Sequence, residues 1–139
     1  MTCKRKTWLE KRDLANQPKV ETISKKFADI PAGGTILIAT PRIVEAYIRQ
    51  IPEGQAGYLK QMRKDLAAEY GTQYTCPLTA GIFLRIVAEA AWEEMQQGKK
   101  STQVAPFWRI IPPDSPAAKK LTFGTEFLRD QQHQEGIFV

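Results

Sequence analysis

Three consecutive segments with helical spacing of their apolar residues constrain the fold of this 139-residue chain most. The first begins at Thr40-Pro41, because threonine can cap free amides and proline fits the first helical turn, and it ends at 52–54. The second spans 59–70 and the third spans 79 to about 97, each followed by a glycine. All three repeat apolar side chains at intervals of three and four, which predicts one buried stripe per helix.

Shorter patterns flank these helices. Residues 20–23 and 35–39 predict two short strands, the first at a sheet edge. After the third helix, the proline-bounded apolar run 105–112 predicts a buried strand, and 119–124 would return beside it. A last helix is expected over 125–134. This order predicts a mainly α fold with a small β wing, a winged helix-turn-helix.

The charge of the chain is concentrated at one end. We expect two parts: residues 1–37, a basic N-terminal arm with one or two short strands, and residues 38–139, the folded domain. The net charge is +5, and residues 1–35 hold eight basic and four acidic side chains against twelve and eleven in the remainder. A basic extension is typical of nucleic-acid-binding proteins, whereas the alternative is a solvated tail that only aids solubility.

Several protein classes are disfavoured by composition. No apolar run approaches the roughly 18 residues needed to span a membrane and no secretory signal is visible, so we expect a cytoplasmic protein without a membrane partner. Cys3, Cys76 and His133 are too few for a disulfide framework, a zinc site or Cys-His catalysis. We therefore expect no metal, no cofactor and no enzyme activity, with Cys76 as a buried structural thiol and His133 at the surface.

Five short motifs follow one another between residues 40 and 137. They are Ile51-Pro52-Glu53-Gly54; Gly57-Tyr58 with Asp65-Leu66-Ala67; Leu84-Arg85-Ile86-Val87-Ala88; Pro106-Phe107-Trp108-Arg109-Ile110-Ile111; and Phe127-Leu128 with Glu135-Gly136. In this order they resemble the motifs of the DNA-binding half of the methylated-DNA-protein cysteine methyltransferases: Ile-Pro-x-Gly, Ser-Tyr-Gly, the recognition helix, Pro-Cys-His-Arg-Val-Val and the closing Glu-Gly. The resemblance implies a winged-helix protein that binds double-stranded DNA.

The same resemblance implies that alkyl transfer has been lost. The family's mechanism needs a thiolate activated by a neighbouring histidine, which a glutamate orients through water. Phe107 and Trp108 occupy the cysteine and histidine positions, and neither ring can serve as nucleophile or base. The chain is therefore most similar to the non-catalytic alkyltransferase-like branch, whose members flip a damaged guanine out of the duplex and mark it for repair proteins.

Roles for individual residues also follow from the resemblance. Arg85 would enter the duplex beside the flipped base, and Tyr58 would rotate its phosphate. The base pocket would contain Phe107, Trp108, Arg109 and Glu135, and Lys60, Arg63 and Lys64 would join Arg85 on one positive face.

Each assignment has a simpler alternative. Phe107 and Trp108 can be ordinary core residues that fill the former pocket rather than stack a base. Arg85 can form a surface ion pair with Glu89, and Glu93 and Glu94 would add to the repulsion of phosphate if they shared its face. The alternative function is a protein-interaction or transcription-related module that has lost lesion binding, and it is preferred if Lys60, Arg63, Lys64 and Arg85 do not form one positive face.

Overall fold

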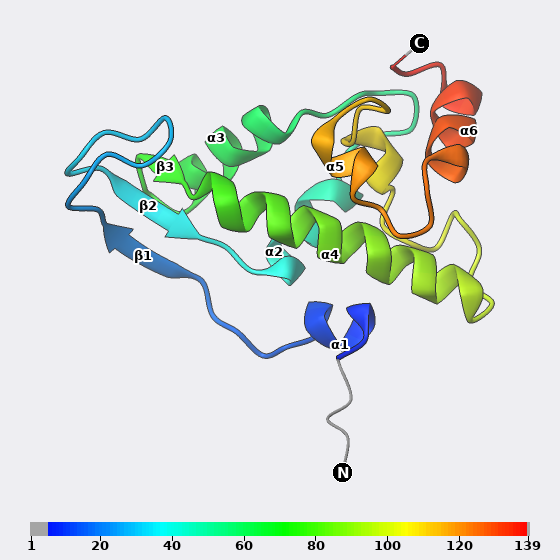
Figure 1. Cartoon of the computed structure of the whole chain (residues 1–139), viewed down its shortest axis with the longest axis horizontal. Coiled ribbons are helices and arrows are strands. Elements are labelled where there is room, and N and C mark those ends of the chain that lie inside the picture. The colour runs from blue at the N-terminus through cyan, green and yellow to red at the C-terminus, as the bar shows by residue number, and fades with distance from the viewer. Residues whose placement is uncertain (1–5, 139) are drawn as a thin grey trace.

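The computed structural model describes residues 6–138 and shows a mainly helical chain with one three-stranded sheet (Figure 1). In chain order the elements are α1 (Trp8–Arg12), β1 (Lys19–Thr22), β2 (Thr35–Ile38), α2 (Pro41–Arg49), α3 (Leu59–Glu69), β3 (Tyr74–Thr75), α4 (Pro77–Gln96), the 3-10 helix η1 (Phe107–Arg109), α5 (Pro116–Lys119) and α6 (Glu126–Glu135). The expected mainly α class with a small β component is confirmed. Cys3, Lys4 and Arg5 lie outside the described residues.

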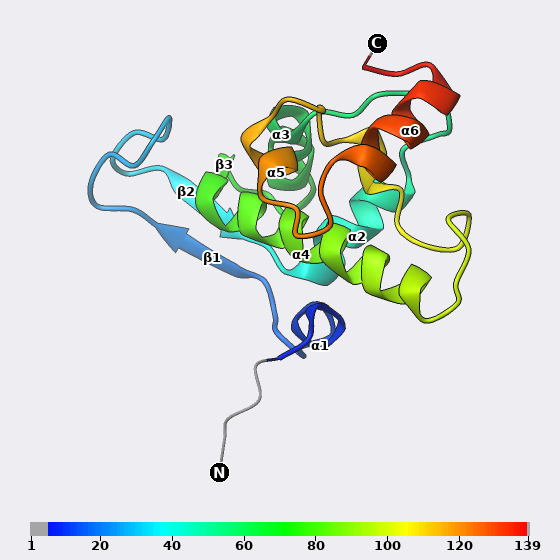
Figure 2. The same cartoon turned by 45° about the vertical axis from the view of Figure 1, so that its right-hand side comes forward.

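Helix α4 runs through the middle of the molecule, with α1 on one side of it and α6 on the other (Figures 1 and 2). It begins at Pro77, because proline loses no hydrogen bond in the first turn, and it is followed by Gly98 with a φ of 107°. The third predicted helix is therefore confirmed, with a start slightly before the expected residue 79.

Helices α2 and α3 also lie where the sequence places them. The Oγ1 atom of Thr40 accepts a hydrogen bond from the backbone N–H of Ile43 at 3.2 Å, and Pro41 takes the first helical position. Val44 and Ile48 from α2 and Met62 from α3 are fully buried in the main core. The predicted capping signal and apolar stripes thus account for both helices.

The sheet combines two strands from the N-terminal part of the chain with β3, which lies between α3 and α4. Strand β1 pairs antiparallel with β2, and β2 pairs parallel with β3, which leads directly into α4. The exposed β1 forms an edge, as predicted. Cys76, between β3 and α4, is 7% exposed and packs in a small second core with Ile30 and Ile36, so the expected buried thiol is confirmed.

The two strands predicted after α4 are wrong. Residues 107–109 form η1 and residues 116–119 form α5, so no wing exists in this part of the described chain. The backbone of this segment forms short-range hydrogen bonds, and the N–H of Phe107 donates to the carbonyl of Ala105 at 2.8 Å. In addition, the Nε2 atom of Gln132 donates to the carbonyls of Trp108 and Ile111 at 3.0 and 2.6 Å. A buried side chain thereby satisfies carbonyls that a strand partner would otherwise bind.

The N-terminal arm is joined to the rest of the structure at two places. Helix α1 packs along α4, and Leu37 of β2 is fully buried in the same core as the helices. The expected boundary near residue 37 therefore falls beside a core side chain, and the division into arm and domain stays a prediction. Among the described residues, no helix is long and apolar enough to cross a membrane, and no group of three or more His, Cys, Asp or Glu could hold a metal ion.

Candidate functional site

Glu135 links three of the five sequence motifs. Its carboxylate accepts hydrogen bonds from the indole Nε1 of Trp108 at 2.6 Å, from the Nε of Arg109 at 2.9 Å and from the backbone N–H of Gly54 at 2.9 Å. Arg109 also donates from Nη1 to the carbonyl of Ile51 at 2.8 Å. Motifs that are far apart in sequence therefore meet around one half-buried ion pair, Arg109–Glu135.

The Gly57-Tyr58 motif is attached to the same cluster. The backbone N–H of Gly57 donates to the carbonyl of Arg109 at 2.6 Å. A Cβ atom at Gly57 would lie 2.7 Å from the Cδ1 of Ile51, so a larger residue there would displace that side chain. Glycine at position 57 thus allows the backbone just before Tyr58 to approach Ile51 and Arg109 closely.

The environment of Glu135 keeps its carboxylate charged. Burial alone would raise its pKa, but the hydrogen bonds from Arg109, Gly54 and Trp108 outweigh burial and lower the pKa below its ordinary value. Because the carboxylate is fully engaged by these donors, it holds η1 against α6 rather than orienting a base.

Phe107 is a core residue. Its side chain has 0% exposure, and the rings of Trp108, Phe123 and Phe127 lie 5.4, 5.8 and 6.1 Å from its ring centroid. Trp108 is 3% exposed and its indole N–H is bonded to Glu135. Of the two alternatives for Phe107 and Trp108, the geometry favours core residues, since Phe107 has no free face for a base.

Residues of the 106–111 motif line two separate hollows. One, of about 520 Å³, is lined by Trp108, Arg109 and Glu135 together with Arg49 and Glu53. The other, of about 640 Å³, is lined by Ile110 of the same motif and by residues from α1, α3, α4 and α5. We call the second the α4 hollow.

The α4 hollow contains the two residues that the resemblance assigns to DNA distortion. Tyr58 and Arg85 both line it, and Leu78 and Ile82 contribute apolar surface that is 61% and 48% exposed. Lys11 and Lys120 add two further positive charges to its lining. Within the described part of the chain, no acidic side chain lines this hollow, so its charge is complementary to an anion.

Arg85 is half-exposed, with 37% of its side chain accessible. Its Nε is buried, lies 3.8 Å from a carboxylate oxygen of Glu89, too far for a hydrogen bond, and has no hydrogen-bond partner in the described structure. Glu89 is 1% exposed and accepts from the backbone N–H and the Oγ1 of Thr122 at 2.8 and 2.5 Å. The expected ion pair between Arg85 and Glu89 is therefore present at 3.8 Å, with its carboxylate buried rather than at the surface.

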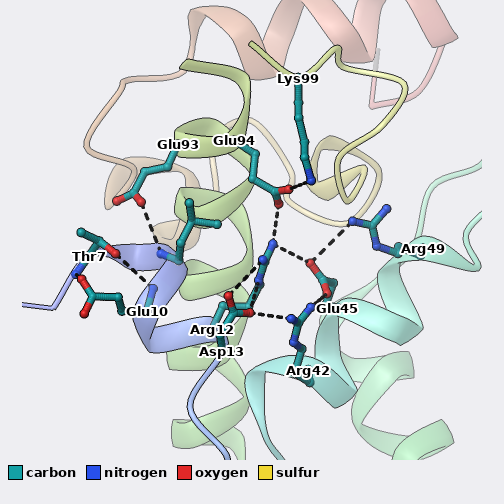
Figure 3. Close-up of polar contacts among 11 residues, drawn as sticks. Thr7, Glu10, Arg12, Asp13, Arg42, Glu45, Arg49, Glu93, Glu94 and Lys99 are labelled. Atoms are coloured by element: carbon teal, nitrogen blue, oxygen red, sulfur yellow. Dashed lines mark hydrogen bonds and ion pairs between the residues drawn. The ribbon is translucent and has the colours of Figure 1, made fainter. Parts of the chain in front are cut away.

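The carboxylates of Glu93 and Glu94, also on α4, are likewise bonded to donors within the protein. Glu93 accepts from the backbone N–H of Trp8 and Leu9 at 2.9 and 3.3 Å, and Glu94 pairs with Arg12 and Lys99 (Figure 3). Phosphate repulsion by Glu89, Glu93 and Glu94, expected from their spacing, is weakened because each carboxylate faces a donor within the protein.

No protein-family model, curated protein or solved structure matches this chain. The resemblance to the methyltransferase family therefore stays a prediction.

The basic residues of α3 lie elsewhere. Lys60, Arg63 and Lys64 line a separate hollow of about 190 Å³ together with Asp29. Arg63 donates to both carboxylate oxygens of Asp29, at 2.9 and 3.2 Å, and to the carbonyl of Thr75 at 3.1 Å. The four basic residues therefore do not line one common hollow, and the charge of Arg63 is already paired.

Sequence analysis missed the residues that α1 and α5 bring to the α4 hollow. Trp8 and Lys11 come from the segment expected to be a basic N-terminal arm, and Lys120 comes from a segment expected to be a strand. The one available signal was the capping box of α1, formed by Thr7 and Glu10, which marks a helix start. Nothing in the pattern indicated that Arg12 would be buried.

Proposed function

We propose that this chain is a non-catalytic, alkyltransferase-like protein that binds double-stranded DNA and holds an altered guanine in the α4 hollow. The observation that carries the proposal is that Tyr58 and Arg85, from separate motifs, line one apolar hollow whose charged side chains are all basic. The helix-turn-helix pair would be α3 and α4, with α4 facing the duplex.

Arg85 and Tyr58 would do different work. The half-exposed guanidinium of Arg85 could donate a charge-assisted hydrogen bond to phosphate or to a base edge. Tyr58 is 57% exposed at the other wall and can contact the backbone of the flipped nucleotide. Flipping costs a few kcal/mol, and apolar or aromatic contact with the base returns roughly 1 to 3 kcal/mol, so the hollow contributes much of what is needed.

Alkyl transfer would be absent because the matching positions hold Phe107 and Trp108, both buried in the core. Arg109 and Glu135 would then support the wall of the site rather than contact the base, since they bind each other at 2.9 Å.

The test is a fluorescence anisotropy titration of the full chain with plain and guanine-alkylated duplexes at about 50 and 200 mM salt. We expect binding that weakens as salt rises and is tighter for the alkylated duplex. Equal affinity for both duplexes would reject lesion recognition alone. No salt-sensitive binding to either would reject the proposal.

A protein-interaction module is the second candidate. The separation of Lys60, Arg63 and Lys64 from Arg85 favours it, as does the exposure of Leu78 and Ile82 on one helix. If neither duplex binds while a photo-crosslinker at Ile82 captures a defined protein and one at exposed Lys19 does not, this function replaces DNA binding.

A further inference from the structure

Helix α1 is fastened to the domain at both ends. At its start, the N–H groups of Trp8 and Leu9 donate to Glu93 of α4. At its end, Arg12 is 8% exposed and its guanidinium points between α2 and α4, where it pairs with Glu45 at 3.2 Å and with Glu94 (Figure 3). Such a buried, fully partnered arginine is typical of a permanent contact rather than of a solvated tail.

This attachment places Trp8 over Arg85. The Cζ atom of Arg85 lies 5.1 Å from the Trp8 ring centroid, and the Nζ of Lys11 lies 4.2 Å from the same ring. Both distances are within the range of cation–π contacts. Because Trp8 and Lys11 also line the α4 hollow, α1 contributes an aromatic wall and a positive charge to the site that holds Arg85.

We propose that α1 is a built-in part of the DNA site, in which Trp8 positions the guanidinium of Arg85 and Lys11 contacts a DNA phosphate. This inference rests on the proposed function. The charges support it, since Lys11, Arg85 and Lys120 are the charged residues that line the hollow within the described chain. If α1 instead covered and blocked the site, it would have to move away before DNA could bind. The buried ion pairs of Arg12 oppose such a movement.

The lysine is tested by the salt dependence of binding. Lys11→Gln should lower the slope of log affinity against log salt by about 1, as expected when one phosphate contact is lost. Lys19→Gln is the matched control, because Lys19 lies on the exposed edge strand β1 and does not line the hollow. It should leave the slope unchanged. Equal slopes for both variants would overturn the role of Lys11.

The tryptophan is tested by a double-mutant cycle with Arg85. Trp8→Ala should weaken binding about 2- to 5-fold, the range given by a cation–π contact at a partly exposed site. In the Arg85→Ala background the same change should have no effect, which a merely structural role for Trp8 would not produce. Thermal melts check that every variant remains folded.

Four results would contradict the inference. Additive effects in the cycle would remove the positioning role of Trp8. Tighter binding by Trp8→Ala or Lys11→Gln would show that α1 covers the site instead of completing it. A wild-type chain that binds no duplex would overturn both this inference and the proposed function, whereas normal wild-type binding with unaffected variants would overturn this inference alone.

Discussion

Individual residues decide whether the site next to η1 is open or filled. Phe107 lies in the core, where three aromatic rings surround it. Two roles for Phe107 and Trp108 were predicted from the sequence, as core residues or as the lining of a base pocket. The sequence could not choose between them, because an apolar run beside a proline looks the same whether it lines a pocket or fills one.

Phe107→Ala should lower the free energy of unfolding by about 3 to 5 kcal/mol, because it leaves a cavity in a packed core. Phe27→Ala is the control, since Phe27 is 40% exposed, and it should cost well under that amount. Urea denaturation of both variants gives the comparison. Similar losses of unfolding free energy in the two variants would show that Phe107 is not closely packed in the core.

Glu135→Gln should also be destabilising, by about 3 kcal/mol, because it leaves Arg109 without its charge partner in a mostly buried setting. Glu126→Gln makes the same chemical change at an exposed site of the same helix and should cost less than about 1 kcal/mol. Chemical denaturation near neutral pH measures both. Equal losses of stability in the two variants would show that the Glu135–Arg109 ion pair does not hold the motifs together.

At the scale of elements, helices were predictable and the wing was not. The start of α2 at Thr40-Pro41 and the glycine after α4 are local signals that act within a few residues. The path of 105–112 depends instead on Gln132, which lies in α6 and bonds the carbonyls of Trp108 and Ile111. The residue pattern of 105–112 carries no information about hydrogen bonds from Gln132. For this reason it predicted a strand that does not form.

The anchor of α1 provides a prediction at this scale. Arg12→Gln should loosen the C-terminal end of α1 from α4, at a cost of roughly 3 kcal/mol, because Glu45 and Glu94 lose a buried charge partner. Hydrogen exchange at the backbone amides of Lys11 and Asp13 should accelerate strongly. Lys6→Gln, an exposed change just before α1, should leave those amides protected. Unchanged protection in Arg12→Gln would contradict the anchoring role.

At the scale of the whole molecule, acid should weaken the fold. Burial would raise the pKa of Glu94, but hydrogen bonds from Lys99 and Arg12 outweigh it, so its folded pKa lies below the ordinary 4.5. A carboxylate with a lowered folded pKa stabilises the protein above its unfolded pKa, and this contribution is lost as pH falls through the folded value.

Urea unfolding between about pH 6 and about pH 3 should therefore show a decreasing free energy of unfolding for the wild type. The decrease should be smaller in Glu94→Gln, which lacks one of the responsible carboxylates. Glu126→Gln should follow the wild type, because Glu126 is exposed. Parallel curves for all three proteins would show that the α4 carboxylates do not control the response.

The location of the DNA site is the central claim about the whole molecule, and Arg85 tests it most directly. Arg85→Ala and Arg129→Ala remove the same charge, but Arg85 lines the α4 hollow, whereas Arg129 lies on α6 in an exposed pair with Asp114. In an anisotropy titration with guanine-alkylated duplex, we expect Arg85→Ala to bind roughly tenfold more weakly than the wild type, and Arg129→Ala to bind within about twofold of it. Equal affinities for the two variants would contradict a DNA site at α4.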